Sequence, residues 1–143
     1  MKILIRETDY AVRLLVALAL TGEKFVSASA MSQELTIPYQ FLRLLVQSLA
    51  KAKLVETKEG KTGGVRLARD PRKITLLDVV EVFQGEVHMS ECLFKSAKCG
   101  NFATCVLRAR IQKIEESVAS QLKAVTVAAM VDDVSEKIKD RFR

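Results

Sequence analysis

All three cysteines of this 143-residue chain fall within one short segment, at Cys92, Cys99 and Cys105. Six residues separate the first pair and five separate the second. Thiolates are the usual ligands of iron–sulfur clusters, and these gaps are too long for the Cys-x-x-Cys clip of a zinc knuckle. A loop with such gaps lets its thiolates converge on a cluster from different directions. The segment therefore predicts an iron–sulfur site, with structural zinc or thiol redox sensing as alternatives.

The excess positive charge lies in the first half of the chain. Residues 1–73 contain 13 Lys or Arg against 7 Asp or Glu, a net charge of +6, whereas residues 74–143 contain ten of each. Basic surfaces recruit polyanions, and nucleic acid is the commonest of these in the cytoplasm. Charge alone is equally compatible with ordinary solubilisation, so the choice depends on the pattern of the elements.

Length and composition narrow the class of protein. The length fits one domain, or one domain with an appended oligomerisation helix. No apolar run approaches the roughly 18 residues of a membrane span, and an odd number of cysteines argues against a secreted disulfide framework. With one histidine and no nucleophile motif or phosphate loop, an enzyme is not expected. We expect a cytoplasmic protein that does not enter the membrane.

The basic half has the pattern of a helix-turn-helix. Apolar residues at helical spacing predict helices over about 7–21, 27–35 and 38–53. Gly22 ends the first, a short strand over 24–27 is possible, and a tight connection joins the second and third.

A β-hairpin is predicted directly after the third helix. Alternating segments at 54–58 and 65–69 flank a glycine-rich turn with basic residues near its tip. A hairpin in this position is a wing, so residues 1–84 are expected to form a winged helix-turn-helix DNA-binding domain.

The second half predicts a cysteine loop and a long helix. Thr75 and Asp78 resemble a capping box that starts a helix to about residue 83. Residues 85–105 are expected to form a cysteine-containing, cluster-binding loop, and residues 106–143 a dimerisation helix and a C-terminal helix over about 126–140. The long helix carries one apolar stripe, suited to a partner helix, made of Leu107, Ile111, Ile114, Val118, Leu122 and Val125. The expected fold class is mainly α with a small β-hairpin.

Three segments carry a family resemblance: Ile37-Pro-Tyr-Gln-Phe-Leu-Arg-Leu-Leu, Gly63-Gly-Val-Arg-Leu-Ala-Arg69 and Ile74-Thr-Leu-Leu-Asp-Val-Val80. With the order of the elements, they resemble the IscR/NsrR family of dimeric winged-helix transcriptional regulators, several of which bind iron–sulfur clusters. The resemblance implies a homodimer, a palindromic site in double-stranded DNA, and repression rather than activation. It implies a dimer interface through Ile111, Ile114, Val118 and Leu122.

The resemblance also implies which residues meet DNA. In such folds the N-terminal part of the recognition helix reads base edges in the major groove, which here assigns Tyr39, Gln40 and Arg43. For these the alternatives are packing beneath the wing for Tyr39 and a solvated helix face for Arg43. The wing residues expected at phosphate or the minor groove, together with the glycines of its turn, are Lys58, Lys61, Gly63, Gly64 and Arg66.

Two departures from the family pattern lie in the DNA-reading region. Pro38 stands where members often have Ser, and Glu59 stands where many have Arg. The operator is therefore expected to differ from those of the best-known members.

The fourth cluster ligand is open. Regulators of iron–sulfur assembly in this family use a histidine three positions after the last cysteine, where this chain has Arg108. The nitric-oxide-sensing branch is thought to use an aspartate of the first helix, supplied across the dimer, and Asp9 matches it. Glu7 and His88 are the next candidates. Three cysteines with a carboxylate favour a [4Fe–4S] over a [2Fe–2S] cluster, sensing nitric oxide, oxygen, iron supply or redox state by moving the loop and the start of the long helix.

Two other functions compete with this interpretation. One is a cluster-free winged-helix regulator that senses thiol oxidation, a metabolite or a partner protein, as some cysteine-metabolism repressors do. The other is a small iron–sulfur electron carrier, which leaves the basic winged-helix half unexplained.

Overall fold

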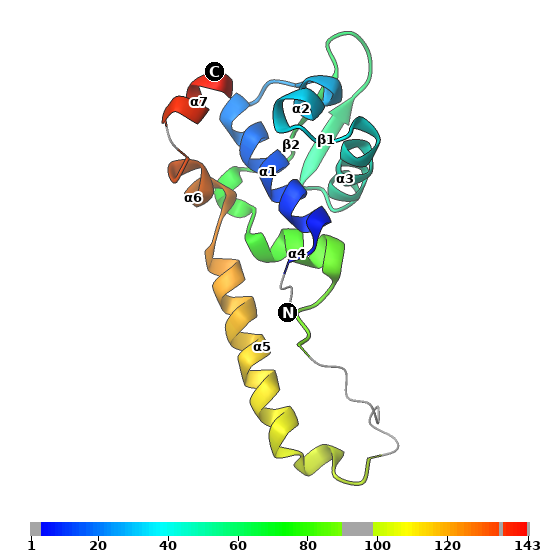
Figure 1. Cartoon of the computed structure of the whole chain (residues 1–143), viewed down its shortest axis with the longest axis vertical. Helices are drawn as coiled ribbons and strands as arrows, with labels where there is room; N and C mark the ends of the chain where they lie inside the picture. Colours follow the sequence, from blue (N-terminus) through cyan, green and yellow to red (C-terminus); the bar gives the residue numbers. More distant parts are fainter. Residues whose placement is uncertain (1–3, 90–98, 135, 143) are drawn as a thin grey trace.

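The computed structural model describes residues 4–89, 99–134 and 136–142. Its fold is mainly helical with one antiparallel hairpin, which confirms the predicted fold class. Figure 1 shows a body from which one long helix projects. The elements in chain order are α1 (Arg6–Thr21), α2 (Ala28–Leu35), α3 (Tyr39–Lys51), β1 (Val55–Lys58), β2 (Gly64–Leu67), η1 (Pro71–Lys73), α4 (Leu76–Gln84), η2 (Phe102–Thr104), α5 (Val106–Ala124), α6 (Val127–Asp132) and α7 (Glu136–Phe142).

Helix α1 forms the centre of the core. Leu14, Leu15 and Leu18 lie on one helical stripe and are fully buried. Around them α1 contacts α3, α4, α6 and β2, so it holds the body together (Figure 1). Gly22, with φ 71°, ends the helix where the sequence predicts.

The helix-turn-helix forms as predicted. Ser27 caps α2, because its Oγ accepts a hydrogen bond from the Ala30 N–H at 3.1 Å. Thr36, in the left-handed conformation, ends α2, and buried Ile37 leads the chain into α3. Helix α3 ends at Lys51 rather than Lys53, since Lys53 has φ 58°.

The wing is a two-stranded hairpin whose base is tied to the chain between α1 and α2. Strands β1 and β2 pair from Val55 opposite Leu67 to Lys58 opposite Gly64. Val26 and Val65 exchange two backbone hydrogen bonds, of 3.0 and 2.8 Å. The short strand predicted over 24–27 is thus a single bridge at Val26.

Helix α5 is an arm anchored at its C-terminal end. The backbone N–H of Leu76 donates to Val125 at 2.8 Å, and that of Val127 donates to Ile74 at 2.9 Å. These bonds join the end of α5 to the start of α4, which is capped by the predicted box of Thr75 and Asp78. The arm then runs away from the body (Figure 1).

The single helix predicted over 126–140 is wrong. Helix α6 ends at Asp132 and α7 begins at Glu136. Both helices pack against α1, which needs a change of direction that a continuous helix does not allow. No described helix is both long and apolar enough to cross a membrane.

Candidate functional site

The first half of α3 presents a polar face to solvent. Leu42, Leu45 and Leu49 face the core, and this orientation leaves Tyr39, Gln40 and Arg43 exposed. Tyr39 is 45% exposed, so part of this residue is open to solvent. The Arg43 guanidinium lies 6.0 Å from the centre of the Tyr39 ring, which brings an aromatic ring and a cation together at the start of the helix.

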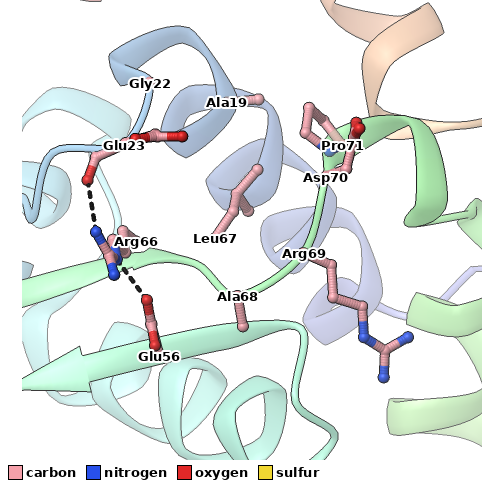
Figure 2. Close-up of a pocket in the computed structure, with 10 residues that line it drawn as sticks. All are labelled: Ala19, Gly22, Glu23, Glu56, Arg66, Leu67, Ala68, Arg69, Asp70 and Pro71. Carbon is pink, nitrogen blue, oxygen red and sulfur yellow. Dashed lines mark hydrogen bonds and ion pairs between the residues drawn. The ribbon is translucent and has the colours of Figure 1, made fainter.

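The wing carries two exposed lysines and one arginine with internal partners. Lys58 and Lys61 are exposed. Arg66 forms an ion pair with Glu56 across the hairpin, donates from a terminal nitrogen to the Glu23 carbonyl at 3.1 Å, and stacks 4.4 Å from the Phe25 ring centre. Figure 2 shows Arg66 between Glu23 and Glu56. Its predicted contact with DNA stays a prediction.

Gly63 and Gly64 are required for a reason that the sequence did not reveal. A Cβ at Gly63 would collide with the Lys58 carbonyl, and a Cβ at Gly64 would collide with the Val26 carbonyl. Gly64 also has φ 145°, and Gly60 within the turn has φ 99°. The two glycines therefore allow close backbone approach, and only Gly64 combines this with a positive φ.

A cleft of about 510 Å³ lies beside the wing base and is lined by charged residues (Figure 2). Its Glu56 and Arg66 pair with each other. The Asp70 carboxylate accepts from the side chain and the backbone N–H of Arg72, and these bonds lower the pKa of Asp70 to about 2. Arg69, also in the lining, donates to the Ala52 carbonyl at 3.2 Å, so these charged side chains mainly hold the wing base and the chain that follows it together.

The first turns of α1 add cations near α3 that the sequence reasoning missed. The Arg6 guanidinium lies 5.2 Å from the Phe41 ring centre, and the Tyr10 ring meets Phe41 edge to face at 5.6 Å. Asp9 forms an ion pair with Arg13 at 3.0 Å. The spacing of Arg6, Tyr10 and Arg13 could have predicted this, because it places them on one face of an amphipathic helix.

The described cysteines lie at the end of the arm. Cys99 and Cys105 are half-buried free thiols, and Cys105 caps α5, its Sγ accepting from the Arg108 N–H at 3.4 Å. Cys92 lies outside the described residues. Figure 1 shows that this end of α5 is far from α1, which carries Asp9 and Glu7. His88, also exposed, pairs with Glu86 at 3.2 Å.

The described residues contain no group of three or more His, Cys, Asp or Glu side chains that could hold a metal ion. Two of the three predicted cysteine ligands thus share one segment, and the predicted carboxylate ligands of the same chain lie elsewhere.

A helix-turn-helix with an exposed polar face, followed by a basic wing, defines a winged-helix DNA-binding protein. The model of the Rrf2 family, described as "Iron-dependent Transcriptional regulator", matches residues 4–133. The chain belongs to this family. It is a DNA-binding transcriptional regulator and not an enzyme.

Relatives and solved structures agree with this assignment. Protein aau3 of Rhizobium meliloti (strain 1021) is 35% identical over 130 residues, covering 90% of this chain and 84% of that protein. The structure of CymR (YrzC), the global cysteine regulator of B. subtilis, matches with a TM-score of 0.76 and 25% identity, covering 94% of this chain and 100% of that one. The structure of T. potens IscR matches with a TM-score of 0.70 and 26% identity, covering 96% and 90%.

Proposed function

We propose that this regulator binds a palindromic operator as a homodimer, acts as a repressor, and adjusts its DNA affinity through an iron–sulfur cluster on the cysteine segment. The observation that carries the proposal is the exposed face of α3 beside a basic wing. In this proposal Tyr39, Gln40 and Arg43 of α3 read base edges. Lys58 and Lys61 of the wing contact phosphate. Arg66 reaches DNA only from the base of the wing, because Glu56 and Glu23 hold its guanidinium.

The DNA part of the proposal is tested by gel retardation with duplexes selected from a random pool. Arg43→Ala is expected to weaken binding to the selected duplex by about fivefold to 150-fold, since a bidentate arginine–guanine pair contributes about 1–3 kcal/mol of discrimination. Lys73→Ala is the matched control, because it removes one exposed positive charge of the same half from η1. Equal losses in the two variants would mean that α3 contributes only charge.

The dimer part rests on the arm. Helix α5 has no buried residue although it carries an apolar stripe, and Ile114 is 46% exposed. A second copy would cover Ile111, Ile114, Val118 and Leu122. A two-fold axis between two arms would place two α3 helices on successive half-sites of a palindrome, as in other dimers that use a helix-turn-helix.

The cysteine segment fits an iron–sulfur cluster by donor chemistry. Cys99 and Cys105 are free thiols, and the Sγ of Cys105 lies at the start of α5, where it accepts from the Arg108 N–H. Cys92, Cys99 and Cys105 would be the thiolate ligands. Asp9 would come from the other protomer, since α1 of the same chain lies far from the start of α5 (Figure 1), and it would have to give up its ion pair with Arg13. A bound [4Fe–4S] cluster would supply sensitivity to nitric oxide, oxygen and redox state.

The cluster is tested by native mass spectrometry and visible absorption of protein purified without oxygen. We expect a dimer that contains iron and sulfide in cluster ratio. Asp9→Ala is expected to lose the cluster or change its spectrum, whereas Glu7→Ala and His88→Ala are expected to keep both. A colourless dimer after reconstitution would contradict the cluster.

A cluster-free regulator is the second candidate, and the similarity to CymR favours it. In that case the colourless protein binds the selected duplex, and its affinity responds to a thiol oxidant through Cys99 and Cys105. The presence or absence of iron and sulfide separates the two candidates, because DNA binding is common to both.

A further inference from the structure

Leu44 is an apolar residue on the solvent-facing side of α3. It is 60% exposed, more than any other large apolar side chain of residues 4–84. The other leucines of α3, Leu42, Leu45 and Leu49, are buried. Leu44 therefore does not contribute to the folding of the body through burial.

The neighbours of Leu44 on the helix surface are polar or charged. With about 3.6 residues per turn, Leu44 lies one turn from Gln40 and one turn from Gln47, and directly after Arg43. All three are exposed. Leu44 thus lies in the middle of the exposed face of α3, and not where this face meets the core.

We propose that Leu44 determines part of the operator sequence by packing against the 5-methyl group of a thymine in the major groove. The inference rests on the proposed binding of α3 in that groove. Arginine pairs with guanine and glutamine with adenine, and the thymine methyl is the apolar group that the four bases offer there. An exposed leucine between such side chains has its chemical match in thymine, and the net charge of +6 in residues 1–73 favours DNA over an apolar protein partner on this face.

The proposal is tested on the full-length protein with an operator selected from random duplexes. Each thymine of the operator is then replaced in turn by deoxyuridine, which removes only the methyl group. Replacement in one half-site only is expected to lower the affinity about fourfold, since a buried methyl-sized group contributes about 0.8 kcal/mol. Replacement in both half-sites is expected to lower it about fifteenfold.

The decisive comparison is with Leu44→Ala. This variant is expected to bind the thymine operator about as weakly as the wild type binds the doubly replaced one, and to be insensitive to deoxyuridine at that position. Ile138→Ala on α7 is the control, because it trims a side chain that is 44% exposed on an element away from α3. Circular dichroism checks that both variants fold.

Three results would overturn the proposal. The first is that deoxyuridine, at whichever thymine it is placed, changes the affinity of the wild type and of Leu44→Ala by the same factor or changes neither. Alternatively, Leu44→Ala reduces the mass of the dimer, which assigns Leu44 to contact with a second copy. If the wild-type protein retains no duplex from the pool, the proposed DNA-binding function itself fails, and this result is distinct from the first two.

Discussion

At the scale of single residues, short-range partners hold the charged groups beside the wing. Arg66 pairs with Glu56 and donates to Glu23, and Asp70 accepts from Arg72. Such exposed pairs contribute little to stability. Their role is to orient side chains where β2 leaves the sheet and enters η1.

The pKa of Asp70 provides a direct test of this arrangement. In the folded protein the pKa is lowered from 3.8 to about 2 by Arg72. The interaction is therefore fully present above pH 3.8 and is lost as the pH falls toward 2. In Arg72→Ala the pKa should return toward 3.8, as measured by NMR titration of the side-chain carboxyl carbon. An unchanged pKa in this variant would show that Arg72 is not the cause.

At the scale of elements, the wing is positioned by the connector between α1 and α2. The two hydrogen bonds between Val26 and Val65 fix its base, and the Val26 carbonyl passes directly over Gly64. The Phe25 ring then supports the guanidinium of Arg66. The base of the wing, from which the two lysines project, is therefore held in one position relative to α3, which contacts β1.

Gly64→Ala is expected to break this junction. The new Cβ meets the Val26 carbonyl at a φ that disfavours alanine, so the free energy of unfolding should fall by about 2 kcal/mol or more. Urea denaturation at one fixed protein concentration measures the change. Gly100→Ala is the control, because nothing lies within 4 Å of its Cβ position, and it should change the unfolding free energy by less than about 0.5 kcal/mol. Similar losses in both variants would argue against a special junction at Gly64.

At the scale of the whole molecule, the arm α5 separates the described cysteines from the winged-helix body. Its C-terminal end is bonded to the body through Ile74 and Leu76, and its N-terminal end begins at Cys105. The Met89 N–H donates to Glu115 at 2.6 Å and ties the chain that leads to the cysteine segment to the side of α5. The described cysteines are thus connected to the body along α5 and along the chain that leaves α4.

Ile114→Asp tests the arm as the dimer interface. The side chain is half exposed in the single chain, so the variant should fold, but a buried charge in the dimer would be unpaired. Light scattering is expected to show a mass that falls from twice 15.9 kDa to 15.9 kDa. Gln112→Asp places the same charge on the opposite face of α5 and should leave the dimer intact. A dimeric Ile114→Asp protein would move the interface elsewhere.

The local elements could be predicted from the order of the amino acids alone. Apolar spacing marked α1, α2, α3 and α5, and the Thr75–Asp78 cap marked α4. The alternating segments around the glycine-rich turn marked the wing. These features follow from contacts between residues a few positions apart, which periodicity and caps record directly.

The partners and exposure of individual side chains became known from the folded chain and not from the sequence. In the fold the C-terminal segment forms two helices, α6 and α7, and the Val26 carbonyl lies close to Gly64. Arg66 forms an ion pair with Glu56, and Leu44 is exposed to solvent. The fold also separates α1, which carries Asp9, from the start of α5 (Figure 1). Each of these outcomes depends on which residues distant in the chain pack together, and the period of a helix or strand carries no record of such contacts.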